Sequence, residues 1–184
     1  MFRTLKGNCL LAAPSLDDPN FFRSVVLMIQ HTEEHSVGLI LNRPTNFSLH
    51  KVVSMICEEK CVHEGHLFCG GPVDGPMLAL HDQEGIGGQV CFEGLKICSD
   101  QNELIKLFRS KEAKLKLFDG LSAWGPDQLE EELETGSWLI TDIDVEEALS
   151  LDTKIWEILV RRIGQNILSA DEKISGYPSD PELN

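Results

Sequence analysis

Short apolar stretches bounded by turn residues recur along most of this 184-residue chain. Each is rich in Val, Ile, Leu or Phe, which is typical of β-strands. Two neighbouring stretches are separated only by a short polar break, so we expect them to pair as a hairpin. The eight expected strands are Asn8–Ala13, Ser24–His31, Ser36–Asn42, His66–Gly70, Met77–His81, Gly88–Phe92, Lys114–Phe118 and Ser137–Thr141.

Apolar residues at helical spacing, with capping signals in front of them, predict helices in the second half of the chain. Asp100 followed by Glu103 has the spacing of a capping box, and an apolar stripe follows it as far as Phe108. The next helix is expected to have Pro126 at its first position and to stop at Gly136.

Three further helices are expected. Asp144 and Glu147 form a second capping-box pattern. A helix that starts at Asp152 is expected to end at Gly164, because two arginines in its last turn suit the negative end of the helix dipole. A short helix is also expected over Ser48–Glu58.

The order of these elements predicts an α+β fold. The strands come in adjacent runs and do not alternate strictly with helices, which favours a mixed or largely antiparallel β-sheet of about eight short strands packed with four or five helices. Residues 1–168 are expected to form this single domain. Residues 169–184, which include Pro178 and Pro181, have little apolar content and are expected to form a loose C-terminal tail.

The formal net charge of −14 bears directly on partners. Nucleic-acid binding depends largely on Lys and Arg that neutralise phosphates, so a surface this acidic argues against it. The segment Asp127–Asp152 alone holds ten acidic side chains and no Lys or Arg. Such a face can serve solubility, or it can be a docking face for a basic partner.

No segment indicates a membrane partner. Even the longest uninterrupted apolar runs, such as Val25–Ile29, are far shorter than the roughly 18 residues of a membrane span. The first apolar stretch, Cys9–Ala13, meets Pro14 at once and is too short for the core of a secretory signal. We therefore expect cytoplasmic residence. The six cysteines, at positions 9, 57, 61, 69, 91 and 98, are then expected to be reduced and mostly buried.

Five side chains that could bind zinc lie within thirteen residues: Cys57, Cys61, His63, His66 and Cys69. Structural zinc sites prefer two ligand pairs separated by a loop of roughly a dozen residues, and here the second pair is crowded against the first. The alternative is that Cys57 and Cys69 are buried in a helix and a strand while the histidines lie in a surface loop. We predict no metal and no other cofactor.

Two glycine-rich segments, Gly70–Gly75 and Gly85–Gly88, could in principle expose backbone N–H groups to a phosphate. Neither is followed by the G-K-S/T that completes a Walker loop. Both are therefore expected to be turns next to strands.

Three segments together resemble the YqgE/AlgH family: the run from Leu10 to Thr45, G-G-P-V at Gly70–Val73, and W-G-P-D-Q-L-E at Trp124–Glu130. The resemblance covers about nine tenths of the chain, and its motifs are specific. It implies that family's fold and its description as a transcriptional regulator, and it supplies no accepted catalytic residue. In the first segment it includes Pro14, Asp18, Pro19, Arg23, Ser24, Asn42, Arg43 and Pro44.

Ser122, in the segment G-L-S-A-W, is the candidate nucleophile. A nucleophile elbow requires Gly two positions after the serine, and Trp124 stands there. The chain also departs from the resembled family here, where Leu121, Ala123 and Asp127 replace Tyr, Gly and Gly.

Three histidines near strand ends could act as a general base: His31, His35 and His81. A lone histidine in such a position is more often a hydrogen-bonded structural residue. No catalytic residue is predicted, and a non-enzymatic role is favoured over an enzymatic one.

In the expected hairpin, Arg23 and Asn42 lie at the same end and Arg43 lies just beyond. This cluster could bind an anion or a carboxylate. Equally, the two arginines could pair with Asp17 and Asp18 and satisfy loop carbonyl groups. The predicted ligand or partner surface consists of Asp18, Arg23, Asn42, Arg43, Gly70, Gly71 and Pro72.

The leading hypothesis is a non-enzymatic cytosolic protein that acts through an unknown protein partner or a small anionic ligand. Direct DNA binding is not expected, because the chain has neither a helix-turn-helix pattern nor a basic stripe. The alternative is an enzyme or zinc-dependent protein of unknown reaction.

Overall fold

The computed structural model describes residues 2–57 and 60–174. Within these residues the chain forms eleven strands in two sheets and five helices, which confirms the predicted α+β class. No helix in the described part of the chain has both the length and the apolar character needed to cross a membrane.

The first sheet is antiparallel throughout. Its strands are β1 (Cys9–Ala12), β2 (Val25–His31), β3 (Ser36–Ile40), β10 (Ser122–Trp124) and β11 (Trp138–Thr141). They lie in the order β10-β3-β2-β1-β11, so β10 and β11 form its two edges.

The second sheet is mixed. Its strands are β4 (Pro44–Ser48), β5 (His66–Cys69), β6 (Leu78–His81), β7 (Gln89–Phe92), β8 (Leu95–Cys98) and β9 (Leu115–Asp119). Their order is β4-β5-β9-β6-β8-β7, in which the β5–β9 pair is parallel and the other pairs are antiparallel.

Three of these strands, β4, β8 and β10, lie outside the predicted eight, and the strands divide between two sheets. β4 begins at a proline and is largely exposed, so it lacks an apolar pattern. β8 follows β7 through a turn at Gly94, whose φ of +81° suits glycine. The strand predicted at Gly88–Phe92 is therefore the first arm of a β-hairpin, and β8 is its second arm. β10 has only three residues and is held by its pairing with β3.

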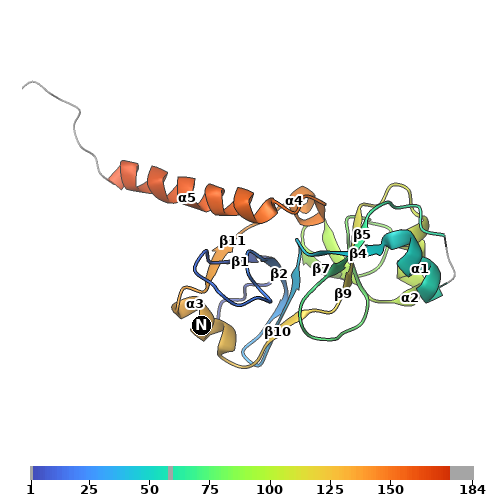
Figure 1. The fold of residues 1–184 in the computed structure, drawn as a ribbon, viewed down its shortest axis with the longest axis horizontal. Helices are drawn as coiled ribbons and strands as arrows, with labels where there is room; N and C mark the ends of the chain where they lie inside the picture. The colour runs from blue at the N-terminus through green and yellow to red at the C-terminus, as the bar shows by residue number, and fades with distance from the viewer. Residues whose placement is uncertain (1, 58–59, 175–184) are drawn as a thin grey trace, which may run out of the picture.

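The two sheets pack face to face across the largest apolar core. It contains Leu11, Val25, Leu27 and Leu39 from the first sheet and Phe68, Leu80, Ile97 and Phe118 from the second. Two helices, α4 (Val145–Leu149) and α5 (Ile155–Ile174), add Leu149, Trp156 and Leu159 to it. Figure 1 shows α5 running beside β1 and β11 and then projecting beyond the sheets.

The outer faces of the sheets are covered by the other helices. α1 (Leu49–Cys57) and α2 (Gln101–Arg109) pack on the second sheet, at the right of Figure 1. α3 (Gln128–Glu134) packs on the first sheet through Leu129, beside Trp124 and Trp138.

Local capping signals place the starts of two helices correctly. The Asp100 carboxylate accepts the N–H groups of Asn102 and Glu103 at the start of α2. At α4, the side chains of Asp144 and Glu147 both make the bonds of the predicted capping box. α1 falls within its predicted range, although Glu58 itself lies outside the described residues.

Two other predicted helix boundaries are wrong. Pro126 is not the first residue of α3, because the helix begins after Asp127, which has a φ of 60°. α5 does not stop at Gly164 and continues to Ile174. Arg162 does not cap the helix, because its guanidinium binds Glu147 and the carbonyl group of Asp142. Of the predicted tail, residues 169–174 continue α5, and residues 175–184 lie outside the described residues.

Candidate functional site

The hairpin predicted near the amino end is present. β2 and β3 are antiparallel, Val26 lies opposite Ile40, and the register shifts between Met28 and Gln30. Arg23, just before β2, and Asn42, just after β3, therefore lie at the same end of the hairpin, next to Arg43.

Asn42 fixes the backbone at this end. Its Nδ2 donates to the carbonyl oxygen of Arg23 at 2.9 Å, and its Oδ1 accepts the N–H of Val25 at 3.0 Å. Arg43 adds a third bond, because its Nη2 donates to the carbonyl oxygen of Phe22 at 2.9 Å. These bonds hold Arg23 at a φ of 52°, a left-handed conformation that is unfavourable for a residue with a side chain.

The Arg23 guanidinium lies against two aromatic rings. Its Cζ is 5.2 Å from the ring centroid of Phe22 and 5.3 Å from that of Trp156, both within cation–π range. Trp156 is itself fixed, since its Nε1 donates to the carbonyl oxygen of Ala12 at 2.9 Å. We call Phe22, Arg23, Asn42, Arg43 and Trp156 the arginine rim.

The ion pairing at the arginine rim differs from the alternative predicted from the sequence. Arg23 Nη1 lies 3.9 Å from Glu157 Oε1, and the two side chains are 57% and 47% exposed, so this pair is weak. Neither Asp17 nor Asp18 forms an ion pair within the described residues. Asp18 Oδ1 instead accepts the N–H of Asn20 and shapes the preceding loop.

Gly70 and Gly71 lie where the two sheets join. The Gly70 carbonyl oxygen accepts the N–H of Ile40, and a Cβ atom on Gly70 would stand 2.3 Å from the carbonyl oxygen of Gly120. Both glycines are buried, whereas Pro72 is exposed. The sheet junction therefore requires these glycines, and its link to the arginine rim is the bond from Cys69 N–H to the carbonyl oxygen of Arg43.

The candidate nucleophile is engaged in this junction. Ser122 is fully buried, and its Oγ donates to the carbonyl oxygen of Gly70 at 3.2 Å. A hydroxyl group in this position is closed to a substrate.

Two of the three candidate bases use both ring nitrogens. His31 Nδ1 accepts the N–H of Leu5 at 2.8 Å, so its proton is on Nε2, which donates to Glu130 at 3.0 Å. His81 is likewise bonded to Gln83 N–H and to the carbonyl oxygen of Gly87, and burial lowers its pKa. His35 is exposed in the β2–β3 turn. Within the described residues, the Ser122 hydroxyl is hydrogen-bonded to Gly70 and to none of these histidines.

The five zinc-compatible side chains do not converge. Across residues 2–57 and 60–174, no group of three or more His, Cys, Asp and Glu side chains is placed to hold a metal ion. Cys61 Sγ and His63 Nε2 face the carbonyl oxygens of His63 and Leu107. The expectation that Cys69 is buried is wrong, because this residue is exposed, and Cys57 is only half-buried.

Lys116 is a buried residue that the sequence pattern did not indicate. Lys116 lies between the sheets with 2% of its surface exposed, and its Nζ donates to the carbonyl oxygen of Leu41 at 3.0 Å. It also lies 4.8 Å from the ring centroid of Phe68. Burial lowers the pKa of Lys116 to about 7, and the nearby Cys9 acts in the opposite direction.

A family model described as AlgH-like matches residues 9–168. The chain belongs to the AlgH-like family. A UPF0301 protein of Cytophaga hutchinsonii is 34% identical over 196 residues, covering 97% of this chain and 98% of that protein. A UPF0301 protein of Myxococcus xanthus is 34% identical over 170 residues, covering 88% and 92%.

Two solved structures have a similar fold. The solution structure of the AlgH protein from Pseudomonas aeruginosa has a TM-score of 0.72 and 27% identity, covering 92% of this chain and 97% of that one. A crystal structure of a Corynebacterium diphtheriae protein has a TM-score of 0.68 and 25% identity, covering 88% and 90%. The AlgH-like fold is thus established.

Proposed function

We propose that this AlgH-like chain is a non-enzymatic binding protein that recognises an anionic group of a protein partner or small ligand at the arginine rim. The exposed, strained Arg23 carries this proposal. Strained residues persist where the surrounding structure fixes them, and they cluster at binding sites and switch regions. Here three side-chain hydrogen bonds from Asn42 and Arg43 hold the strained segment in place.

The guanidinium is well suited to a carboxylate or phosphate. Its planar fork can form two parallel hydrogen bonds to such a group. The rings of Phe22 and Trp156 orient it, and Glu157 at 3.9 Å is too exposed to hold it firmly. An incoming anion would replace a weak ion pair with a bidentate one.

Direct DNA binding is not part of this proposal. The net charge of −14 opposes a phosphate backbone, and one arginine fork does not offset it. Any role in transcription would therefore pass through the bound partner or ligand.

Binding of inorganic phosphate and of succinate at low ionic strength tests the proposal. We expect saturable shifts of the Arg23 Nε–H and Trp156 Nε1–H resonances in NMR spectra, with a dissociation constant of roughly millimolar size, because exposed ion pairs are weak. Arg23→Gln should abolish the saturable shift of the Trp156 Nε1–H resonance with either anion. The matched control is Arg161→Gln, which removes another exposed arginine from α5 and should leave both shifts unchanged. Equal shifts in the Arg23→Gln variant, or none in the unaltered protein, would refute the proposal.

A further inference from the structure

The outer edge of β11 has no strand beside it. β11 pairs with β1 alone in the part of the chain that the structure describes. Ala13 N–H points toward the β11 side and donates to the carbonyl oxygen of Ser137. Ala12 N–H points the other way, toward the β2 side, and donates to the carbonyl oxygen of Ser24. Because backbone groups of successive strand residues point to opposite sides, Leu139 bonds to β1 while Trp138 and Ile140 direct their N–H and C=O groups outward.

This open edge ends at a defined point. Arg162 Nη2 donates to the carbonyl oxygen of Asp142 at 2.6 Å, so the outward backbone group after Ile140 is already occupied. The available edge therefore comprises Trp138 and Ile140, whose outward backbone groups can pair with a short added strand.

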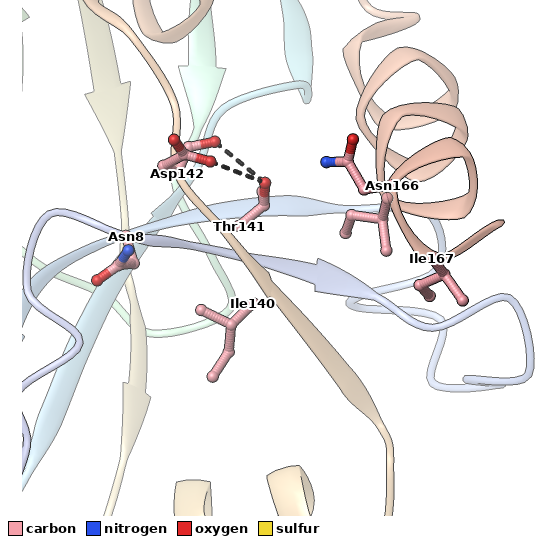
Figure 2. A pocket seen from close by; sticks show the side chains of 7 residues that line it. Asn8, Ile140, Thr141, Asp142, Asn166 and Ile167 are labelled. Carbon is pink, nitrogen blue, oxygen red and sulfur yellow. Dashed lines mark hydrogen bonds between the residues drawn. The ribbon is translucent and has the colours of Figure 1, made fainter. Parts of the chain in front are cut away.

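Apolar side chains lie on both sides of the open edge. A pocket of about 530 Å³ separates it from α5, where Ile163 and Ile167 contribute to the lining. Figure 2 shows this pocket, with Ile140 on the strand and Asn166 and Ile167 on the helix. A second pocket of about 360 Å³ shares Ile140 with the first and is lined by Leu5 and Leu133 among others. Ile140 and Ile167 are 46% and 58% exposed, so these apolar surfaces are uncovered.

The charge around the edge distinguishes between possible occupants. Glu130 lines one pocket and Asp142 the other, within a segment of ten acidic and no basic residues from 127 to 152. Of the nearby cations, Arg162 is paired with Glu147 at 2.8 Å, and Arg3 lies in the lining of the second pocket. A second copy of this chain would bring another net charge of −14 to the same place, which opposes self-association.

We infer that the open edge of β11 is a docking site for an extended, basic segment of a partner protein. The segment adds a strand antiparallel or parallel to β11 and hydrogen-bonds to Trp138 and Ile140. Its central apolar side chains fill the two pockets, and flanking Lys or Arg side chains face Glu130 and Asp142. Backbone bonds then provide affinity, while the pockets and the acidic flanks provide specificity.

A synthetic peptide of alternating Val and Ile, flanked by two lysines at each end, is the probe. We expect it to bind with micromolar to millimolar affinity and to slow amide hydrogen exchange at Ile140 in the full chain. A peptide with glutamates in place of the lysines, and one with proline in place of the central Val, should each bind about tenfold more weakly or not at all, because they remove charge complementarity and strand pairing respectively.

Two variants of the protein separate backbone pairing from apolar contact. Ile140→Pro removes an outward N–H that makes no bond to β1, and Ile140→Lys removes the apolar side chain; each should weaken peptide binding by about tenfold or more. The matched control is Val90→Lys on β7, an exposed apolar residue at the edge of the other sheet. Should Ile140→Pro fail to fold, the exchange rate at Ile140 and the Ile140→Lys variant still test whether the peptide docks at the edge of β11.

Three results would overturn the inference. The first is equal binding of the lysine and glutamate peptides. The second is unchanged exchange at Ile140 with saturating peptide. The third is a stable dimer in light scattering that Ile140→Lys dissociates, which would assign the edge to a second copy.

Discussion

Two basic side chains of this protein lie against aromatic rings in opposite surroundings. Lys116 lies between the two sheets with 2% exposure, whereas the side chain of Arg23 is 57% exposed at the arginine rim. Each is near a ring, Phe68 in the first case and Phe22 with Trp156 in the second. The same kind of contact therefore lies inside the core in one case and at an exposed surface in the other.

The difference follows from the chemistry of the two side chains. An amine can lose its proton when it is buried, so Lys116 can enter the core as a neutral donor to the Leu41 carbonyl group. A guanidinium keeps its charge at all accessible pH values and must face water or an anion. The lysine thus ties β9 to the end of β3, and the arginine stays at the surface.

The largest expected effect is the pH dependence of stability due to Lys116. Its pKa falls from 10.5 to about 7 on folding, so above pH 7 the unfolded chain binds a proton that the folded chain lacks. The free energy of unfolding should therefore rise with pH, by roughly 2 kcal/mol between pH 7 and pH 9. Urea denaturation at several pH values measures this slope, and Lys116→Met should flatten it.

Buried thiols limit the pH range over which the free energy of unfolding rises. Burial raises the pKa of Cys91 and Cys98 to about 11 from 9.0, and that of Cys9 in the same direction. Above pH 9 the unfolded chain loses thiol protons that the folded chain keeps, so stability should fall again. An equal slope between pH 7 and pH 9 in the Lys116→Met variant would show that Lys116 does not titrate as its burial implies.

A smaller effect is expected at the support of the arginine rim. Asn42→Ala removes both bonds that hold the segment from Arg23 to Val25 and leaves the N–H of Val25 without its acceptor. We expect a loss of about 1–2 kcal/mol in the free energy of unfolding. The matched control is Asn46→Ala on the exposed strand β4, which should change stability by less than about 0.5 kcal/mol. Similar losses in both variants would mean that Asn42 does not fix the rim.

Local signals explain what could be predicted from the sequence. The β2–β3 hairpin and the capping box of α4 depend on residues that are close in the chain, and both are present. The contact of Arg23 with Trp156 joins distant segments, so no spacing rule indicates it. Lys116 was missed because a single lysine between leucines looks like the outward-facing residue of a strand with one buried face, whereas β9 is covered on both faces.

The smallest effect on stability is expected from Arg23→Gly, which tests directly whether Arg23 serves the fold. Glycine adopts a φ of 52° without strain. The relief of this strain should roughly offset the stabilisation lost with the two cation–π contacts. The free energy of unfolding should change by less than about 1 kcal/mol, whereas phosphate and succinate binding should disappear. Arg23→Ala, which loses the contacts and keeps the strain, should be about 1 kcal/mol less stable than Arg23→Gly. If Arg23→Gly instead destabilises the protein as much as Asn42→Ala does, Arg23 serves the fold as Lys116 does. That result would contradict the proposed binding of an anionic ligand at the arginine rim.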